Sequence, residues 1–212
     1  MTENIQVFTQ SSIRIQTRHG VIYVDPFQMK DEPHDADYIF ITHDHSDHFS
    51  NDDIKKVRKN STILIVPEKI GKLANVLVHD QDRLIVVKPG IYKEVDGLEF
   101  ETIPAYNNIK PYHPKSAGFV GYVFRVDHKR IYVAGDTSLT KEAQKVRCDI
   151  ALVPIGGTYT MDARKAAELI NILRPEVAIP THYGSIVGKK SDAEKFKSLV
   201  KPPIKVEIKM QY

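Results

Sequence analysis

Residues 43 to 48 read His-Asp-His-Ser-Asp-His, which places three imidazoles within six positions. His43 and His45 are two residues apart, so in extended backbone their side chains point to the same side. Asp47 and His48 come where the chain turns towards a predicted helix, and they can reach a second position. Zinc accepts imidazole nitrogen and carboxylate oxygen as ligands. We interpret the segment as a metal-binding motif rather than a solvent-exposed histidine-rich loop.

Two more residues of ligand type follow predicted strands much later in the chain. Asp136 comes after the apolar segment 130–134, in Gly-Asp-Thr, and His182 comes after the buried strand expected at 177–179. Loops at strand ends, held by a rigid scaffold, are where binding groups usually project. The sequence therefore predicts one site assembled from the ends of distant strands.

The elements that must position these residues are mostly short strands. Strands are expected at 13–17, 21–24, 38–41, 62–66, 84–87, 91–95, 98–103, 119–126, 130–134, 150–154 and 177–179. Helices are expected from a Ser50 cap to about residue 59, after Thr137 to about 146, from Met161 to Leu173 with Thr160 as the cap, and after a capping box at Ser191. This pattern predicts an α+β fold with two facing sheets. We expect one domain, 1–212, built from two αβ halves of about 1–105 and 106–212.

Composition excludes several classes of protein. The chain has 212 residues and a net charge of +3, with basic and acidic residues interspersed. Because no basic face stands out, we expect no nucleic-acid partner. The single cysteine, Cys148, favours a reducing compartment, and neither a signal peptide nor a membrane-spanning run is recognisable. We expect a cytoplasmic protein with no membrane partner, and homo-oligomerisation stays open.

The segment from Thr42 to His48 resembles the HxHxDH signature of the metallo-β-lactamase superfamily. Further parts of that pattern follow in order along nearly the whole chain, which makes the resemblance specific: Asp25-Pro26, Gly135-Asp136-Thr137 and Pro180-Thr181-His182-Tyr183-Gly184. Within the superfamily the chain most resembles short stand-alone hydrolases related to the ascorbate-6-phosphate lactonases and the N-acyl-phosphatidylethanolamine phospholipases.

This resemblance implies a four-layer αββα sandwich with a dinuclear site along one edge of the two sheets. It also implies roles for single residues: His43 and His45 bind the first metal, Asp47, His48 and His182 bind the second, and Asp136 bridges the two. The expected cofactors are two divalent ions. Zinc suits the donor set best, and manganese and iron also tolerate it.

One position departs from the pattern. A further histidine for the first metal is expected just after the strand that ends near Pro104, but Asn107 stands there and the next histidine is His113, six residues later. Either the loop brings His113 into the site, or Asn107 or water fills the position and the first metal is weakly held. We favour His113, because neutral imidazole is the better zinc ligand.

The implied reaction is attack by metal-bound hydroxide on an ester, lactone or phosphodiester bond of a small, anionic substrate. Asp47 is the expected catalytic residue, since it can orient the hydroxide and accept its proton. The candidates for substrate contact lie at the same edge: Asn107, Tyr159, Thr160 and Tyr183, with Lys110 or Lys115 nearby. Two other functions compete with this one. They are a nuclease-type phosphodiesterase and a non-enzymatic metal-binding or sensor protein, the latter motivated by Asn107.

Overall fold

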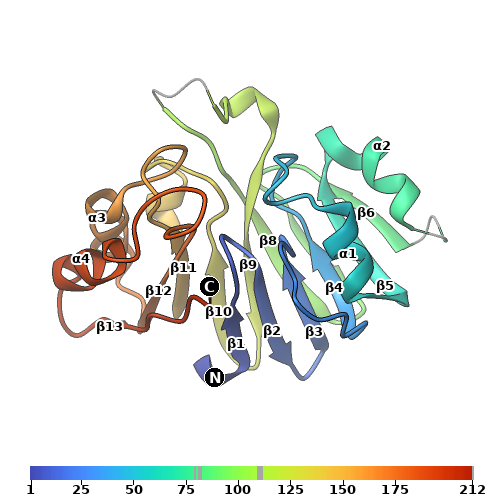
Figure 1. Cartoon of the computed structure of the whole chain (residues 1–212), viewed down its shortest axis with the longest axis horizontal. Helices are drawn as coiled ribbons and strands as arrows, with labels where there is room; N and C mark the ends of the chain where they lie inside the picture. Colours follow the sequence, from blue (N-terminus) through green and yellow to red (C-terminus); the bar gives the residue numbers. More distant parts are fainter. Residues whose placement is uncertain (79, 81–82, 109–111, 212) are drawn as a thin grey trace.

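The computed structural model describes residues 1–78, 80, 83–108 and 112–211. Two β-sheets face each other across the centre of the molecule, and helices cover their outer faces (Figure 1). The helices α1 and α2 lie outside the first sheet, and α3 and α4 lie outside the second. The four-layer αββα arrangement expected from the sequence is therefore confirmed.

The first sheet contains six strands in the order of the sequence. They are β1 (Ile5–Val7), β2 (Ile13–Thr17), β3 (Gly20–Val24), β4 (Ala36–Phe40), β5 (Arg58–Pro67) and β6 (Leu84–Val87). The pairs β1–β2 and β2–β3 are antiparallel, which confirms the hairpin predicted at His19-Gly20. From β3 to β6 all pairs are parallel, so β3, β4 and β5 end at the same edge of the sheet.

The second sheet contains seven strands, in the order β13-β12-β11-β10-β9-β8-β7. They are β7 (Tyr92–Val95), β8 (Leu98–Pro104), β9 (Val120–Val126), β10 (Lys129–Val133), β11 (Ile150–Pro154), β12 (Val177–Thr181) and β13 (Lys205–Val206). Strands β7 to β10 pair antiparallel and β10 to β13 pair parallel. After Val87 the chain leaves the first sheet and enters the second. Strands β7 and β8 therefore belong to the second sheet, although they precede residue 105.

Four α-helices are described: α1 (Asn51–Val57), α2 (Gly71–Ala74), α3 (Ala163–Leu173) and α4 (Asp192–Leu199). Ser50 caps α1 as predicted, because its side chain accepts a hydrogen bond from the Asp53 amide. The helix predicted after Thr137 is wrong: only a 3-10 turn, Ala143–Lys145, forms there. At the predicted start of this helix, the Ser138 amide donates to the Tyr106 carbonyl, and the Thr137 carbonyl accepts from the Met161 amide. These backbone groups bond to distant loops instead of to a helix.

One predicted helix cap is wrong, and the other, Ser191, is the N-cap of α4 but lacks the predicted side-chain bond. The cap of α3 is Asp162, whose side chain accepts from the Lys165 amide, whereas the Thr160 hydroxyl donates to the Met161 carbonyl. At α4 the Ser191 side chain makes no capping bond. A carboxylate two residues closer to α3 can reach the unpaired amides of its first turn, which Thr160 cannot.

Alternation along the strands decides which side chains fill each layer of the core. In β3, Ile22 and Val24 point between the sheets, and Val21 and Tyr23 point towards α1 and α2. Phe40 of β4 stands at the centre between the sheets, where its ring meets those of Phe100, Tyr122 and Phe124 edge-on. Because successive strand residues face opposite sides, both faces of each sheet are buried and the strand ends are held rigidly.

No helix in the described ranges is long and apolar enough to cross a membrane.

Candidate metal centre

The candidate residues come from loops at one edge of the two sheets. The motif at 43–48 follows β4, Asp136 follows β10, and His182 follows β12. His113 lies in the connection between β8 and β9. Because the parallel strands end at this edge, the loops that follow them meet there. The structure thus assembles the residues that the sequence predicted from distant strand ends.

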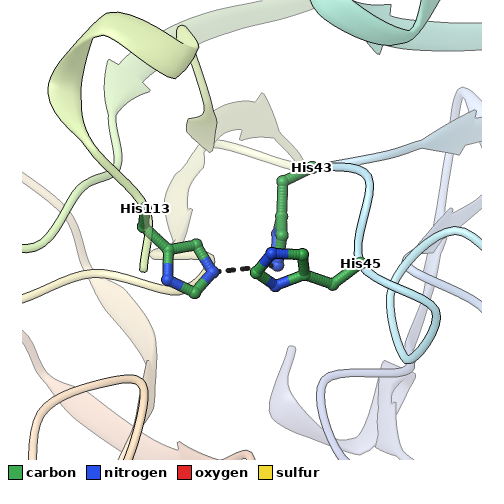
Figure 2. Close-up of side chains that lie close together, drawn as sticks. All are labelled: His43, His45 and His113. Carbon is green, nitrogen blue, oxygen red and sulfur yellow. Dashed lines mark hydrogen bonds between the residues drawn. The ribbon is translucent and has the colours of Figure 1, made fainter. Parts of the chain in front are cut away.

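The first group consists of His43, His45 and His113, whose ring nitrogens lie within 4.8 Å of one another. Figure 2 shows the three imidazoles converging, with His113 facing the two histidines of the motif. The Nε2 atoms of His113 and His43 are 3.2 Å apart. His43 and His113 are buried and His45 is half-buried. The chain therefore brings His113, and not Asn107, to the first pair of histidines.

The second group consists of Asp47, His48 and His182, again within 4.8 Å. The Oδ2 atom of Asp47 lies 3.3 Å from His182 Nε2 and 3.6 Å from His48 Nε2. The two histidines have almost no exposed surface, while the Asp47 side chain is 18% exposed. Solvent and ligands can therefore reach this group from the Asp47 side.

Asp136 lies between the two groups. Its Oδ1 atom is 3.4 Å from His48 Nε2, and its Oδ2 atom is 3.3 Å from His182 Nε2. The same Oδ2 atom is 3.7 Å from His113 Nε2 and 4.0 Å from His43 Nε2. One carboxylate thus faces ring nitrogens of both groups, which is the placement that a bridging ligand requires.

The turn that carries Asp136 depends on the glycine before it. Gly135 has φ +64°, and a Cβ atom there would lie 2.9 Å from the Val120 carbonyl oxygen and 3.2 Å from Thr42. Only glycine adopts this conformation without cost in such a close approach of backbones. The sequence Gly-Asp therefore lets the chain turn sharply out of β10 and aim the carboxylate inward.

The distances in both groups fit a metal centre. Ligand atoms 2.0–2.1 Å from a tetrahedral ion are about 3.3–3.4 Å from one another, and the contacts above between neighbouring donors are 3.2–3.6 Å. His48 Nε2 and Asp136 Oδ1 are buried, face each other at 3.4 Å, and have no other hydrogen-bond partner. Buried polar atoms without partners are unfavourable, and two divalent cations among these donors would satisfy them.

Asp25 holds the second group from behind, a role that sequence reasoning did not assign. Its carboxylate accepts hydrogen bonds from the Thr42 amide (2.8 Å), the Thr42 hydroxyl (2.6 Å) and His48 Nδ1 (2.7 Å). With its oxygens taken in this way, Asp25 orients a ligand rather than serving as one. The Asp25-Pro26 pair after an early strand was the available signal, because a carboxylate bound to the far nitrogen of a ligating histidine is a common partner.

The two groups differ in their charge before any metal binds. Burial lowers the pKa of His113 to about 4 and that of His43 well below its ordinary value. Burial also disfavours a charged His182, but the carboxylates of Asp136 and Asp47 outweigh it and raise that pKa to about 9. The carboxylates of Asp136 and Asp25 likewise raise the pKa of His48, although burial alone would lower it. At neutral pH His43 and His113 are therefore neutral, and protons occupy His48 and His182.

This difference predicts that the two positions respond differently to pH. Metal binding at the second group must displace the proton of His182, so the apparent affinity there should rise at least about tenfold per pH unit between pH 7 and pH 9. The first group should change little, because the pKa of His113 lies below this window. Calorimetric titration of chelator-treated protein with zinc, in buffers of different ionisation enthalpy, counts the protons released at each step. An equal pH dependence at both steps would contradict this prediction.

Asn107 joins the His113 loop to neighbouring segments through hydrogen bonds. Its side-chain nitrogen donates to the carbonyls of Tyr112 (2.9 Å) and Tyr159 (2.7 Å), and its oxygen accepts from the Ser138 hydroxyl (2.7 Å). Its backbone amide donates to the His113 carbonyl (2.8 Å). The same side-chain nitrogen also lies 3.1 Å from His113 Nδ1. The predicted contact of Asn107 with substrate stays a prediction. Asn107 closes the loop that presents His113.

The other predicted substrate contacts have different surroundings. Tyr183 is fully buried among residues that pack under α3 and α4, and its contact with substrate stays a prediction. Tyr159 is half-buried and its ring meets Tyr112 edge-on at 5.1 Å. Lys115 pairs with Glu142 at 2.6 Å on the exposed side of the loop, and Lys110 lies outside the described residues.

Several hollows open on the described surface, and one of them is lined by residues that follow a candidate ligand in the sequence. A cavity of about 430 Å³ is lined by Ser138, Thr160, Arg164 and Lys165 among others, and Ser138 follows Asp136 by two residues. A larger open groove of about 890 Å³ lies over β8, β9 and β10 and contains none of the candidate ligands. Of these two hollows, the cavity of about 430 Å³ is therefore the one that can belong to the site.

Comparison with known proteins agrees with this geometry. A family model described as a β-lactamase superfamily domain matches residues 4–182. A UPF0173 metal-dependent hydrolase of Thermoplasma acidophilum is 35% identical over 190 residues, which cover 84% of this chain and 82% of the relative. The chain belongs to the metallo-β-lactamase superfamily, in its UPF0173 family of metal-dependent hydrolases.

Solved structures of other superfamily members share the fold. Igni18, a metallo hydrolase from Ignicoccus hospitalis, is 26% identical with a TM-score of 0.77 over 98% of this chain and 95% of that one. CmlA, a diiron β-hydroxylase from Streptomyces venezuelae, has the same TM-score at 14% identity, over 96% of this chain and 52% of that one. At that identity the likeness shows the fold alone. The narrower resemblance to ascorbate-6-phosphate lactonases stays a prediction.

Proposed function

We propose that this protein is a dinuclear hydrolase that cleaves an ester, lactone or phosphodiester bond. The observation that carries the proposal is the position of Asp136, whose oxygens lie 3.3–3.4 Å from His48 and His182 on one side and 3.7 Å from His113 on the other. A single buried carboxylate facing two groups of imidazoles supports two metal ions held side by side. In this proposal His43, His45 and His113 hold the first, and Asp47, His48 and His182 hold the second.

Divalent ions in such a centre supply Lewis-acid activation of water at neutral pH. The protein supplies the positions of the reacting groups. Asp47 is ionised, because His182 and His48 lower its pKa more than burial raises it, and its side chain is the partly exposed carboxylate of the second group. As an ionised carboxylate, Asp47 can accept a hydrogen bond from the attacking water and orient it, while the buried Asp136 keeps the two groups in register.

The donor set supports zinc and leaves other metals open. Imidazole nitrogen predominates in the first group, and zinc favours nitrogen over oxygen donors of this kind. The second group adds carboxylate oxygens, which manganese and iron also accept. The likeness to a diiron protein of the same fold is consistent with that tolerance.

The cavity lined by Ser138 and Thr160 supports a small anionic substrate. Its volume of about 430 Å³ lies in the range of small-molecule sites. Arg164 and Lys165 contribute positive charge to its wall against the one carboxylate of Asp162, and Ser138 and Thr160 contribute hydroxyls. Lys165 also pairs with Glu168 at 3.4 Å. We propose that the anionic end of the substrate lies here and that its scissile bond reaches the metal centre. A cavity of this size favours a small molecule over a nucleic acid.

Metal content and its removal test the function. Purified protein is expected to contain close to two equivalents of metal per chain and to hydrolyse members of a panel of p-nitrophenyl esters, lactones and bis-p-nitrophenyl phosphate. Chelation should remove this activity, and re-addition of zinc or manganese should restore it. Turnover that persists in metal-free protein, or a stoichiometry of one in active protein, would overturn the dinuclear proposal.

The competing functions have less support. The sensor hypothesis was motivated by Asn107 in place of a histidine, and that motive disappears because His113 lies 3.2 Å from His43. The nuclease hypothesis needs a nucleic-acid surface beside the site. The wall of the cavity of about 430 Å³ holds two cations, Arg164 and Lys165, and one carboxylate, Asp162, a balance of charge that suits one small anion better than a polynucleotide.

A further inference from the structure

Gln10 is a buried polar residue beside the second group that no assigned role explains. It lies in the turn between β1 and β2, with φ +59° and no exposed surface. Its backbone carbonyl accepts a hydrogen bond of 2.9 Å from the His182 amide. A non-glycine residue in this backbone region is uncommon, and here it brings the side chain directly against His182 and Asp47.

The Gln10 amide occupies a corner of the second group. Its Nε2 atom lies 3.2 Å from Asp47 Oδ2 and 3.5 Å from His182 Nε2. These lengths match the 3.3 Å that separates the Asp47 and His182 donors from each other. Adjacent ligands about 2.1 Å from a five-coordinate ion are about 3.0–3.6 Å apart, so three atoms separated in this way could bind a single ion. The Gln10 Oε1 atom, in contrast, is buried without a hydrogen-bond partner.

We propose that Gln10 is a ligand of the second metal through its side-chain oxygen. Without an ion the Asp47 carboxylate attracts the amide hydrogens, so nitrogen faces the group. A divalent cation between Asp47, His48 and His182 reverses the sign of the field at this point. The amide then favours the orientation with oxygen inward, which needs only rotation about its last side-chain torsion. The two orientations have nearly the same shape, so the buried surroundings accommodate both.

This ligand changes the character of the second position. Together with Asp47 and Asp136 it supplies oxygen, and His48 and His182 supply nitrogen. Amide and carboxylate oxygens are hard donors that suit manganese and similar ions. The second position is therefore mixed in its donors, while the first is built from imidazoles. We expect the two positions to differ in which divalent ion they prefer.

The competing explanation is that Gln10 only orients Asp47 through a hydrogen bond. Two variants distinguish this explanation from metal ligation. Gln10→Met keeps the length of the side chain without the amide, and Gln10→Glu puts a carboxylate in its place. If Gln10 only donates to Asp47, both changes weaken metal binding, since a glutamate would face another carboxylate. If Gln10 is a ligand, only methionine weakens it. Gln6→Met, an exposed position on β1, is the matched control.

The probe is cobalt(II) titrated into chelator-treated protein, followed by visible absorption and by competition with a chelator. We expect Gln10→Met to lower the affinity for the second equivalent of cobalt about tenfold or more. The intensity of its absorption bands should also change, because the coordination number of that ion falls. Gln10→Glu should raise the affinity for that equivalent about tenfold, because a charged ligand binds a cation more strongly. The first equivalent and the Gln6→Met protein should not change.

Weaker binding by Gln10→Glu, or unchanged binding and an unchanged spectrum in Gln10→Met, would overturn the assignment. Tighter binding by Gln10→Glu with no change in its spectrum would also overturn it, because charge would then act without coordination. The thermal midpoint of each metal-free variant checks that it folds, and the glutamate variant gives the decision if methionine does not fold. The inference rests on the proposed dinuclear centre, but no substrate enters the experiment. A failure to find hydrolysis would therefore leave this result standing.

Discussion

Replacing Asp136 with asparagine is expected to lower kcat/KM for hydrolysis by about a thousandfold or more, a loss typical when a group that stabilises the reacting charge is removed. The change keeps the shape of the side chain and removes its charge. Asparagine offers one acceptor oxygen, whereas both Asp136 oxygens face imidazoles, at 3.4 Å to His48 and 3.3 Å to His182. The two groups would lose their shared ligand, and metal content should fall from two equivalents towards one.

Asp44→Asn is the matched control for this experiment. Asp44 belongs to the same six-residue motif, but it pairs with Lys69 at 2.9 Å and lies in none of the groups that could hold a metal. Its replacement should leave metal content and kcat/KM within about twofold, because a surface ion pair contributes little. If Asp136→Asn keeps two metals and full activity, the bridging role of Asp136 is wrong.

Replacing Asp25 with asparagine is expected to reduce both stability and metal binding. The carboxylate accepts three hydrogen bonds of 2.6–2.8 Å from Thr42 and His48. An amide would place hydrogens against these donors, and the loss of a buried charged partner costs about 3 kcal/mol or more in the free energy of unfolding. Released from its partner, His48 should bind metal about 10–100-fold more weakly. Denaturant unfolding of the metal-free protein and zinc titration measure the two effects separately.

Asp53→Asn provides the comparison for stability alone. Asp53 is also buried and accepts hydrogen bonds of 2.9 Å from the backbone amides of Gln28 and Met29, but it lies at α1, outside the groups that could hold a metal. This variant should lose stability and keep its metal affinity. If Asp25→Asn lowers stability but leaves zinc affinity unchanged, Asp25 is a structural residue and not a partner of the centre.

Hydrophobic alternation identified most of the sheet. The strands expected at 13–17, 38–41 and 150–154 lie within one or two residues of β2, β4 and β11, because burial on one or both faces leaves a clear record in the pattern of apolar residues. For the segment after Thr137, where a helix was expected, the pattern of apolar residues did not predict the structure. There the Ser138 amide donates to the Tyr106 carbonyl and the Met161 amide donates to the Thr137 carbonyl. Contacts with distant loops outweigh the local preference for helix.

The His-Asp-His-Ser-Asp-His motif by itself indicated metal binding, because ligand types at short spacing lie close together in any conformation. The resemblance carried by Asp136 and His182 extended it to two metals. Neither could decide between His113 and Asn107, since the answer depends on how a loop closes. In the structure Asn107 bonds across that loop to Tyr112 and His113, and so sends the histidine inward.

What the sequence determined by itself is the fold class, the motif and the superfamily, because these are written in local periodicity and in short spacings. Only the tertiary structure decided which residues surround the motif. It placed His113 against His43, Asp25 behind His48, and the Gln10 amide 3.2 Å from Asp47. These contacts join segments far apart in the chain, and their geometry follows from the packing of two sheets rather than from any local pattern.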